Sequence, residues 1–193
     1  MILISLEEQI KYRLVNGNKA YFANRTLFKS KLISKTAKIR LYKTLIRPVV
    51  TYACETWVLK ETIKQKLLIF ERKFLRRIFG PNRGTDNYRR IKTNNELNKL
   101  IKNQNIVNHI RSLRIGWLGH LIRMDDQRLV KRLYTWKPIG DRDVGRPEIR
   151  WEDDTMNDLR KIKVTNLNVA RDRLAWRRIV EKAKTFTSEV VVP

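Results

Sequence analysis

Acidic residues are scarce in this chain, above all in its first third. Between Gln9 and Cys54 there is no Asp or Glu, although the stretch holds eleven Lys and Arg residues. A solvated domain surface usually mixes charges of both signs, because uncompensated like charges repel and destabilise the compact state. The basic residues are interleaved with apolar ones, which indicates a folded surface that faces a polyanion. Nucleic acid is the first candidate for that polyanion.

The charge is unevenly spread over the 193 residues. Up to Met124 there are 27 basic and 7 acidic residues, a net charge of +20. From Asp125 onward there are 16 and 12, a net charge of +4. The sequence therefore predicts a strongly basic part followed by a nearly balanced part.

Cysteine and histidine are almost absent. One cysteine, Cys54, excludes an intramolecular disulfide and indicates a reducing compartment. Together with His109 and His120 it cannot supply the four ligands of a structural zinc site. The two histidines are best interpreted as satisfied or exposed side chains, although His120 could contact a phosphate or a base.

Long apolar runs are also missing. Met1 to Leu6 is apolar, but Glu7 and Glu8 follow at once, so the run is too short for a secretory signal, and nothing later is long enough for a membrane span. We expect a nuclear or cytoplasmic protein that is neither secreted nor bound to a membrane, and no small-molecule substrate.

Glycine and proline are few, and helical spacing recurs. Residues 42–57 place apolar side chains on one helix face, which Pro48 should kink or split. A second helix is expected over 67–78, ended by Gly80 and Pro81. A third helix is expected over 106–124. Gly116 and Gly119 disfavour a helix there, unless their small size lets another helix approach closely.

The remaining sequence contains two connectors and two more helices. We expect a turn at 80–84, a loop at 137–147 and a frayed tail at 188–193. One helix should begin at Pro147 and turn Trp151 and Leu159 inward, and a final one should bury Val169 and Trp176. No strand pattern stands out. The predicted fold class is mainly α: a basic helical bundle (1–80), a helical continuation (81–136), and a smaller C-terminal region of a loop plus helices (137–193).

The helix at 67–78 has an almost wholly cationic polar face. Its four basic residues span about 140° of one side. A solvated face is the alternative, but the preceding basic run favours phosphate contact. A second acid-free stretch, 97–124, adds three arginines. The predicted nucleic-acid-binding residues are Lys35, Lys38, Lys43, Arg47, Arg72, Lys73, Arg76, Arg77, Arg111, Arg114 and Arg123.

The aromatic residues give a weaker signal. Tryptophan can stack on unpaired bases. Four of the five tryptophans nevertheless fall in register with an apolar helix face, which favours core packing. Trp136, beside the Pro- and Gly-containing loop, is the one that this register does not assign to the core.

One acidic cluster holds Glu152, Asp153, Asp154 and Asp158. Paired carboxylates could bind Mg²⁺. The better interpretation is that these acids cap the start of a helix, where the dipole favours negative charge, and form salt bridges with Arg146 and Arg150. There is no Gly-rich phosphate loop and no Ser/His/Asp set, and Cys54 falls on a buried face.

Several strings, in order, resemble the region after the polymerase palm in non-LTR (LINE-type) retrotransposon endonuclease-reverse transcriptases. They are residues 41–57 (LYKTLIRPVVTYACETW), 70–81 (FERKFLRRIFGP), 114–124 (RIGWLGHLIRM), 145–151 (GRPEIRW) and 172–177 (DRLAWR). The resemblance covers most of the chain. It implies a thumb and C-terminal region that starts just after the palm.

In that family the helical thumb grips the RNA or DNA template–primer duplex through its backbone. The family's palm binds metal through a Phe- or Tyr-Ala-Asp-Asp signature, which this sequence lacks, as it lacks the endonuclease domain and the residues for a zinc knuckle. The resemblance therefore implies a binding fragment that is not itself an enzyme. Its partners would be the template–primer and the missing palm and endonuclease domains, and Mg²⁺ would be needed only in the palm. A stand-alone helical DNA-binding protein and a degenerate retroelement remnant remain open.

Overall fold

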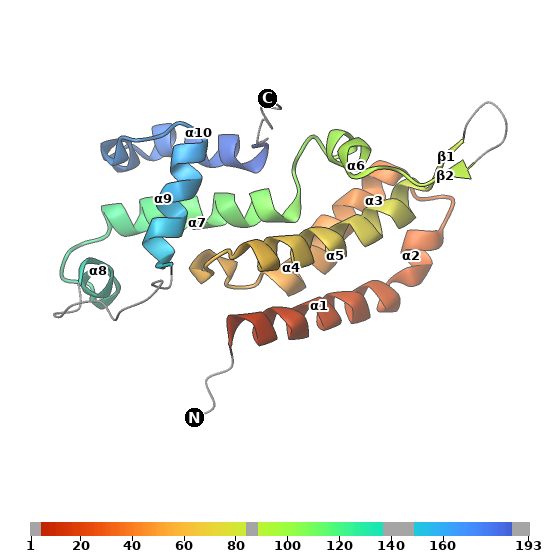
Figure 1. Ribbon diagram of the computed structural model, residues 1–193, viewed down its shortest axis with the longest axis horizontal. Coiled ribbons are helices and arrows are strands. Elements are labelled where there is room, and N and C mark those ends of the chain that lie inside the picture. The colour runs from red at the N-terminus through yellow and green to blue at the C-terminus, as the bar shows by residue number, and fades with distance from the viewer. Residues whose placement is uncertain (1–4, 84–88, 137–148, 187–193) are drawn as a thin grey trace. The chain divides into compact units, whose positions relative to one another are not determined.

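The computed structural model describes residues 5–83, 89–136 and 149–186 (Figure 1). The chain forms two compact units: a first unit of residues 1–53 and 59–107, and a second unit of residues 54–58 and 108–193. Helices dominate both, so the mainly α prediction is confirmed. The predicted segment 81–136 is divided between the two units.

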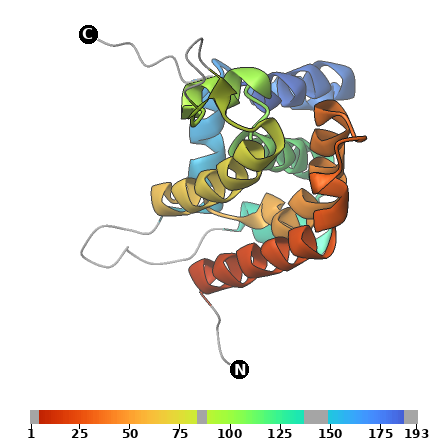
Figure 2. The same cartoon turned by 90° about the vertical axis from the view of Figure 1, so that its right-hand side faces the viewer.

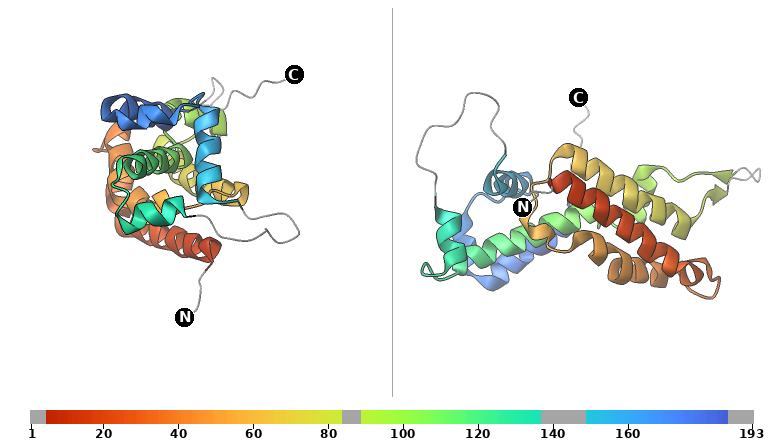
Figure 3. Two further views of the ribbon diagram at one scale, coloured as in Figure 1. Left: turned by 90° about the vertical axis from the view of Figure 1, so that its left-hand side faces the viewer. Right: turned by 90° about the horizontal axis from the view of Figure 1, so that it is seen from below.

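The first unit opens with α1 (Leu6–Ala23), whose start is fixed by a capping box. Ser5 Oγ accepts the Glu8 N–H at 3.3 Å, and the Glu8 carboxylate accepts the Ser5 N–H at 3.1 Å. Helix α1 packs against α4 (Arg47–Thr51) and α5 (Glu61–Phe79), and Figure 3 shows it alongside α5. Gly17 permits this approach, because a Cβ there would lie 2.7 Å from Phe70 Cζ and from Val50 Cγ2.

Pro48 shapes the next part of the first unit. Helix α3 (Lys35–Leu41) continues through one π-helical stretch, η1 (Tyr42–Ile46), into α4. Proline cannot donate to the carbonyl four residues earlier and its ring clashes with it, so a wider turn before Pro48 relieves both problems. The predicted interruption is confirmed, and it takes the form of a π turn. The short helices α2 (Arg25–Lys29) and η2 (Cys54–Thr56) lie before and after this stretch in the chain.

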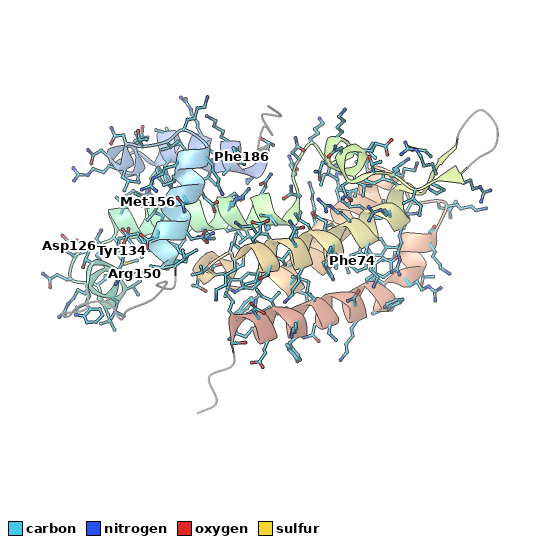
Figure 4. All side chains as sticks on the ribbon, in the orientation of Figure 1. Phe74, Asp126, Tyr134, Arg150, Met156 and Phe186 are labelled. Carbon is cyan, nitrogen blue, oxygen red and sulfur yellow. The ribbon has the colours of Figure 1, made fainter. Side chains whose placement is uncertain are left out.

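Helix α5 supplies the core of the first unit. Its apolar face is buried, and Phe74, labelled in Figure 4, is fully enclosed. The Phe74 ring lies 4.5 Å from that of Tyr21 and 4.8 Å from that of Phe70, measured between centroids. The predicted stop is confirmed: α5 ends at Phe79, and Gly80 takes a positive φ of 70°. The observed helix begins at Glu61, six residues earlier than the apolar pattern indicated.

The first unit also contains a small hairpin that the sequence did not predict. Strand β1 (Asn82–Arg83) pairs antiparallel with β2 (Arg89–Arg90). Two residues per strand are too few to show the alternation that identifies a strand. Helix α6 (Asn94–Leu100) follows and begins with a second capping box, formed by Thr93 and Glu96.

The second unit is built around α7 (Ile106–Arg123), of which all but the first two residues belong to it. It also contains α8 (Leu129–Thr135), α9 (Trp151–Lys161), η3 (Leu167–Arg171) and α10 (Arg173–Lys184). Helix α9 runs crosswise to α7 and α10 (Figures 1 and 2). The buried core of the unit comprises Ile115, Leu118, Leu159, Ile162, Ala170, Trp176 and Ala183.

Gly119 is where α10 meets α7. The buried Trp176 indole donates its N–H to the Ile115 carbonyl at 2.9 Å, and a Cβ on Gly119 would overlap with that indole. The predicted close approach is confirmed at Gly119. It does not occur at Gly116, where a Cβ would meet nothing within 4 Å.

Two helix starts in the second unit lie elsewhere than predicted. Helix α10 begins at Arg173 because the Asp172 carboxylate caps it, accepting the Leu174 N–H at 2.8 Å, so Val169 lies in η3 instead. Helix α9 begins at Trp151. Pro147, the loop predicted at 137–147 and the tail at 188–193 lie outside the described residues. Within the described ranges, no helix is both long enough and apolar enough to cross a bilayer.

Candidate nucleic-acid interface

The two units differ greatly in charge. The first unit has 24 basic and 6 acidic residues, a net charge of +18, while the second has 19 and 13, a net charge of +6. The acid-free stretch after Gln9 covers α1 to α4, and most of its cations are exposed. Among the predicted contacts there, Lys35 is exposed at the start of α3 and Lys38 is half-buried.

Lys64 and Lys66, in the first half of α5, pair with Glu61 and Glu7, whereas the cations near the end of the helix contact neutral groups. Lys73 Nζ donates to Asn18 Oδ1 at 3.3 Å, and Arg76 donates to the Lys92 carbonyl at 3.3 Å and to Asn94 Oδ1 at 2.8 Å. The Arg77 guanidinium lies 5.1 Å from the centroid of the Tyr21 ring. Amides, carbonyls and aromatic rings orient these side chains without cancelling their charge.

Arg72 completes this cationic group, which we call the α5 cluster (Arg72, Lys73, Arg76 and Arg77). Its Nε is buried and has no hydrogen-bond partner among the described residues. Partial burial, and then the neighbouring Arg76 charge, lower the pKa of Arg72. The four cations thus come from one helix and repel one another, an arrangement that an external anion would relieve.

Lys43 and Arg47 lie in a different setting, a polar cluster inside the first unit. Lys43 Nζ donates to Gln104 Oε1 at 2.7 Å, and the half-buried Arg47 lies near the fully buried Glu71 carboxylate. Glu71 also accepts the Ile106 N–H at 2.8 Å. Burial raises the pKa of Glu71 to about 7, opposed by the Ile106 N–H and then by the Arg47 charge. Burial, and then Glu71, raise the pKa of Tyr42.

Glu71 was not singled out from the sequence. The signal was available, because Glu71 stands four residues after Leu67 and three before Phe74, in register with the buried face of α5. A charged residue at such a position needs partners, and here they come from η1, α4 and the chain around residue 106.

The arginines of α7 are engaged inside the second unit. Arg114 is fully buried and pairs with Asp154 at 2.8 Å and with Asp158 at 3.2 Å. Arg111 Nε pairs with Asp158 at 3.1 Å, and its guanidinium lies over the ring of Phe186, labelled in Figure 4. In this structure Arg114 has no access to a surface ligand, and Arg111 is already paired with a carboxylate. Their partners are about 40 residues away in the sequence, so an acid-free stretch on α7 could not show this pairing.

Arg123, the third arginine predicted on α7, has a carbonyl partner. Its Nη1 donates to the Ala170 carbonyl at 2.5 Å, which ties the end of α7 to η3. The side chain is half-buried.

The acidic cluster has the structural role expected of it, with other partners. Glu152, Asp153 and Asp154 lie in the first turn of α9, as a helix start favours. Asp154 and Asp158 pair with Arg111 and Arg114 of α7, and Arg146 is outside the described residues. Burial raises the pKa of Asp158, against the opposing charges of Arg111 and Arg114. The described residues contain no group of three His, Cys, Asp or Glu side chains placed to hold a metal ion.

The tryptophans are mainly packing residues. Trp57 and Trp176 are buried and Trp117 and Trp151 are half-buried, while Trp136 is 65% exposed, as the helical register predicted. Cys54 is buried too, as expected.

A cavity of about 340 Å³ in the second unit is lined largely by apolar atoms from α7 and by Glu55 and Val180. Trp117 and the exposed His120 line it as well, with ring centroids 5.2 Å apart.

The sequence is similar to that of a transposon-derived protein of Caenorhabditis elegans. The two are 22% identical over 161 residues, which cover 80% of this chain and 57% of the relative. The chain therefore spans a little more than half the length of that protein. No family model matches the chain, and no solved structure matches it. The similarity supports a transposable-element origin.

Proposed function

We propose that this chain binds the sugar-phosphate backbone of a template–primer duplex, as the thumb-like part of a non-LTR retrotransposon reverse transcriptase. The observation that carries the proposal is the α5 cluster, whose hydrogen bonds and ring contacts among the described residues are all to neutral groups. The net charge of +18 on the first unit and the transposon-derived relative support it.

Binding of this kind has no sequence preference, because phosphate contacts position a protein without reading bases. The sequence contains no Phe- or Tyr-Ala-Asp-Asp signature, so the proposal covers binding and not polymerisation. Lys35 and Lys38 would extend the contact along α3. Lys43 and Arg47 would act indirectly, by holding η1 and α4 against α5.

The test is fluorescence anisotropy with a labelled RNA–DNA duplex of about 20 base pairs over a range of salt. If about six phosphates are contacted, affinity should fall roughly a thousandfold between about 50 and 200 mM salt. Replacing the α5 cluster (Arg72→Gln, Lys73→Gln, Arg76→Gln and Arg77→Gln) should weaken binding to all duplexes alike and flatten the salt dependence.

A charge-matched control removes four cations from the second unit: Arg128→Gln, Arg132→Gln, Arg150→Gln and Arg160→Gln. It should retain most of the affinity, and circular dichroism should show unchanged helicity for both variants. Equal losses in the two variants would mean that net charge alone attracts the duplex. A tenfold preference for one duplex sequence would indicate a DNA-reading protein instead.

A further inference from the structure

The solvent face of α10 carries arginines without partners. Arg173, Arg177 and Arg178 are all exposed, and none of their guanidinium groups has a hydrogen bond, ion pair or ring contact among the described residues. At 100° per residue they span about 140° of the helix, the same arc as the α5 cluster. We call them the α10 arginines.

The acids near these arginines are occupied. Glu181 lies on the same face and pairs with Lys184 at 2.5 Å, and the Asp172 carboxylate caps α10 through the Leu174 N–H. Deeper in the unit, Asp154 and Asp158 are used by Arg111 and Arg114. The residues from Asp125 onward are therefore nearly balanced in charge as a whole, but the solvent face of α10 is locally cationic.

Helix α10 is a rigid support for such a surface. Its opposite face is fixed by the buried Trp176, bonded to the Ile115 carbonyl, and by the buried Ala183. Lys182 Nζ also donates to the Ile162 carbonyl at 3.1 Å. A fixed helix presents its guanidinium groups at set positions, which lowers the entropy that binding must overcome.

We propose that the α10 arginines form a second backbone-binding site, for the phosphates of duplex nucleic acid. Arginine suits phosphate because its planar fork donates two parallel hydrogen bonds. From Arg173 to Arg178 the helix rises about 7.5 Å. A duplex presents roughly four phosphate charges over that length of its axis, enough to engage all three side chains. This inference rests on the proposed nucleic-acid function but concerns a different unit and different residues.

The test uses the full chain and the same duplex. The triple variant Arg173→Gln, Arg177→Gln and Arg178→Gln should lower the slope of log affinity against log salt by about 2 to 3, since each phosphate contact contributes about 0.9. The control variant Arg128→Gln, Arg132→Gln and Arg150→Gln loses the same charge from α8 and the start of α9, and Figure 1 shows α8 across α7 from α10. Its slope should change by less than about 1.

A second measurement does not depend on variants. Arginines of the wild-type chain are modified with phenylglyoxal, with and without duplex, and mapped by mass spectrometry. The duplex should protect the α10 arginines and leave Arg128 and Arg132 reactive. The inference would be overturned if the α10 arginines stayed reactive at saturating duplex concentrations. It would also be overturned if phosphatidylserine vesicles protected them and the duplex did not. If the α5 variant loses affinity while the α10 variant keeps both affinity and slope, the second site fails and the proposed function stands. If instead the α10 variant loses affinity and the α5 variant keeps it, the binding surface lies on α10 and the proposed role of the α5 cluster fails.

Discussion

Glu71 shows how one buried carboxylate can couple stability to pH. Its folded pKa of about 7 lies above the ordinary value of 4.5. Between these pH values the folded chain holds a proton that the unfolded chain has released, so stability falls as pH rises through this window. The effect is on the order of 3 kcal/mol at most.

We expect the variant Glu71→Gln to lose this part of the pH dependence. Urea unfolding at pH 5 and pH 7.5 should show a smaller stability difference in the variant than in the wild type. Burial raises the pKa of Asp158 as well, so the comparison must be between the two proteins and not between two pH values of one. Equal differences in both proteins would show that Glu71 does not titrate in this range.

Arg114 is the counterion of the second unit. Replacing it with Met leaves the Asp154 and Asp158 carboxylates without that partner, and uncompensated buried charge is costly. We expect Arg114→Met to lower the free energy of unfolding by about 3 to 5 kcal/mol in urea titrations at pH 7. The exposed Arg128→Met is the control and should change it by less than about 0.5 kcal/mol. A loss in Arg114→Met as small as in the control would contradict the buried ion-pair cluster.

At the scale of the element, the two glycines of α7 form a matched pair. Gly119→Ala should push Trp176 away and break its bond to Ile115, at a cost of about 1 to 3 kcal/mol. Gly116→Ala adds a methyl group in open space and should stabilise the helix by up to about 1 kcal/mol. Thermal unfolding of the two variants should therefore move in opposite directions. Shifts of the same sign would mean that α10 does not dock at Gly119.

Elements with a strong period could be predicted from the sequence, and those defined by partners could not. The apolar spacing of 67–78 and 106–124 predicted α5 and α7, because burial against a core imposes that spacing. The π turn before Pro48 and the start of α10 at Arg173 depend on local hydrogen bonds, which a pattern of apolar residues does not encode. Strands β1 and β2 have two residues each, which is too short for any alternating pattern.

At the scale of the whole molecule, charge counted along the sequence and charge available at the surface are different quantities. The count correctly separates a strongly basic part from a nearly balanced one. It could not show that Arg114 would be buried against Asp154, or that the Arg177 guanidinium would have no partner in the part of the chain that the structure describes. Both facts depend on which helices pack together. Lys73 and Arg77 of α5 are therefore exposed, whereas Arg111 and Arg114 of α7 are paired with carboxylates.

The single cysteine has a use that follows from its burial. Cys54 is fully enclosed, in the five-residue segment where the chain leaves the first unit and joins the second. A thiol reagent can reach it only when that segment opens, so the rate at which Cys54 is labelled measures how often the segment opens. A second cysteine placed on the exposed face of α10, at Leu174, would react at once. One chain could then carry a fast surface label and a slow internal one, and no other cysteine would have to be removed because the sequence has only Cys54.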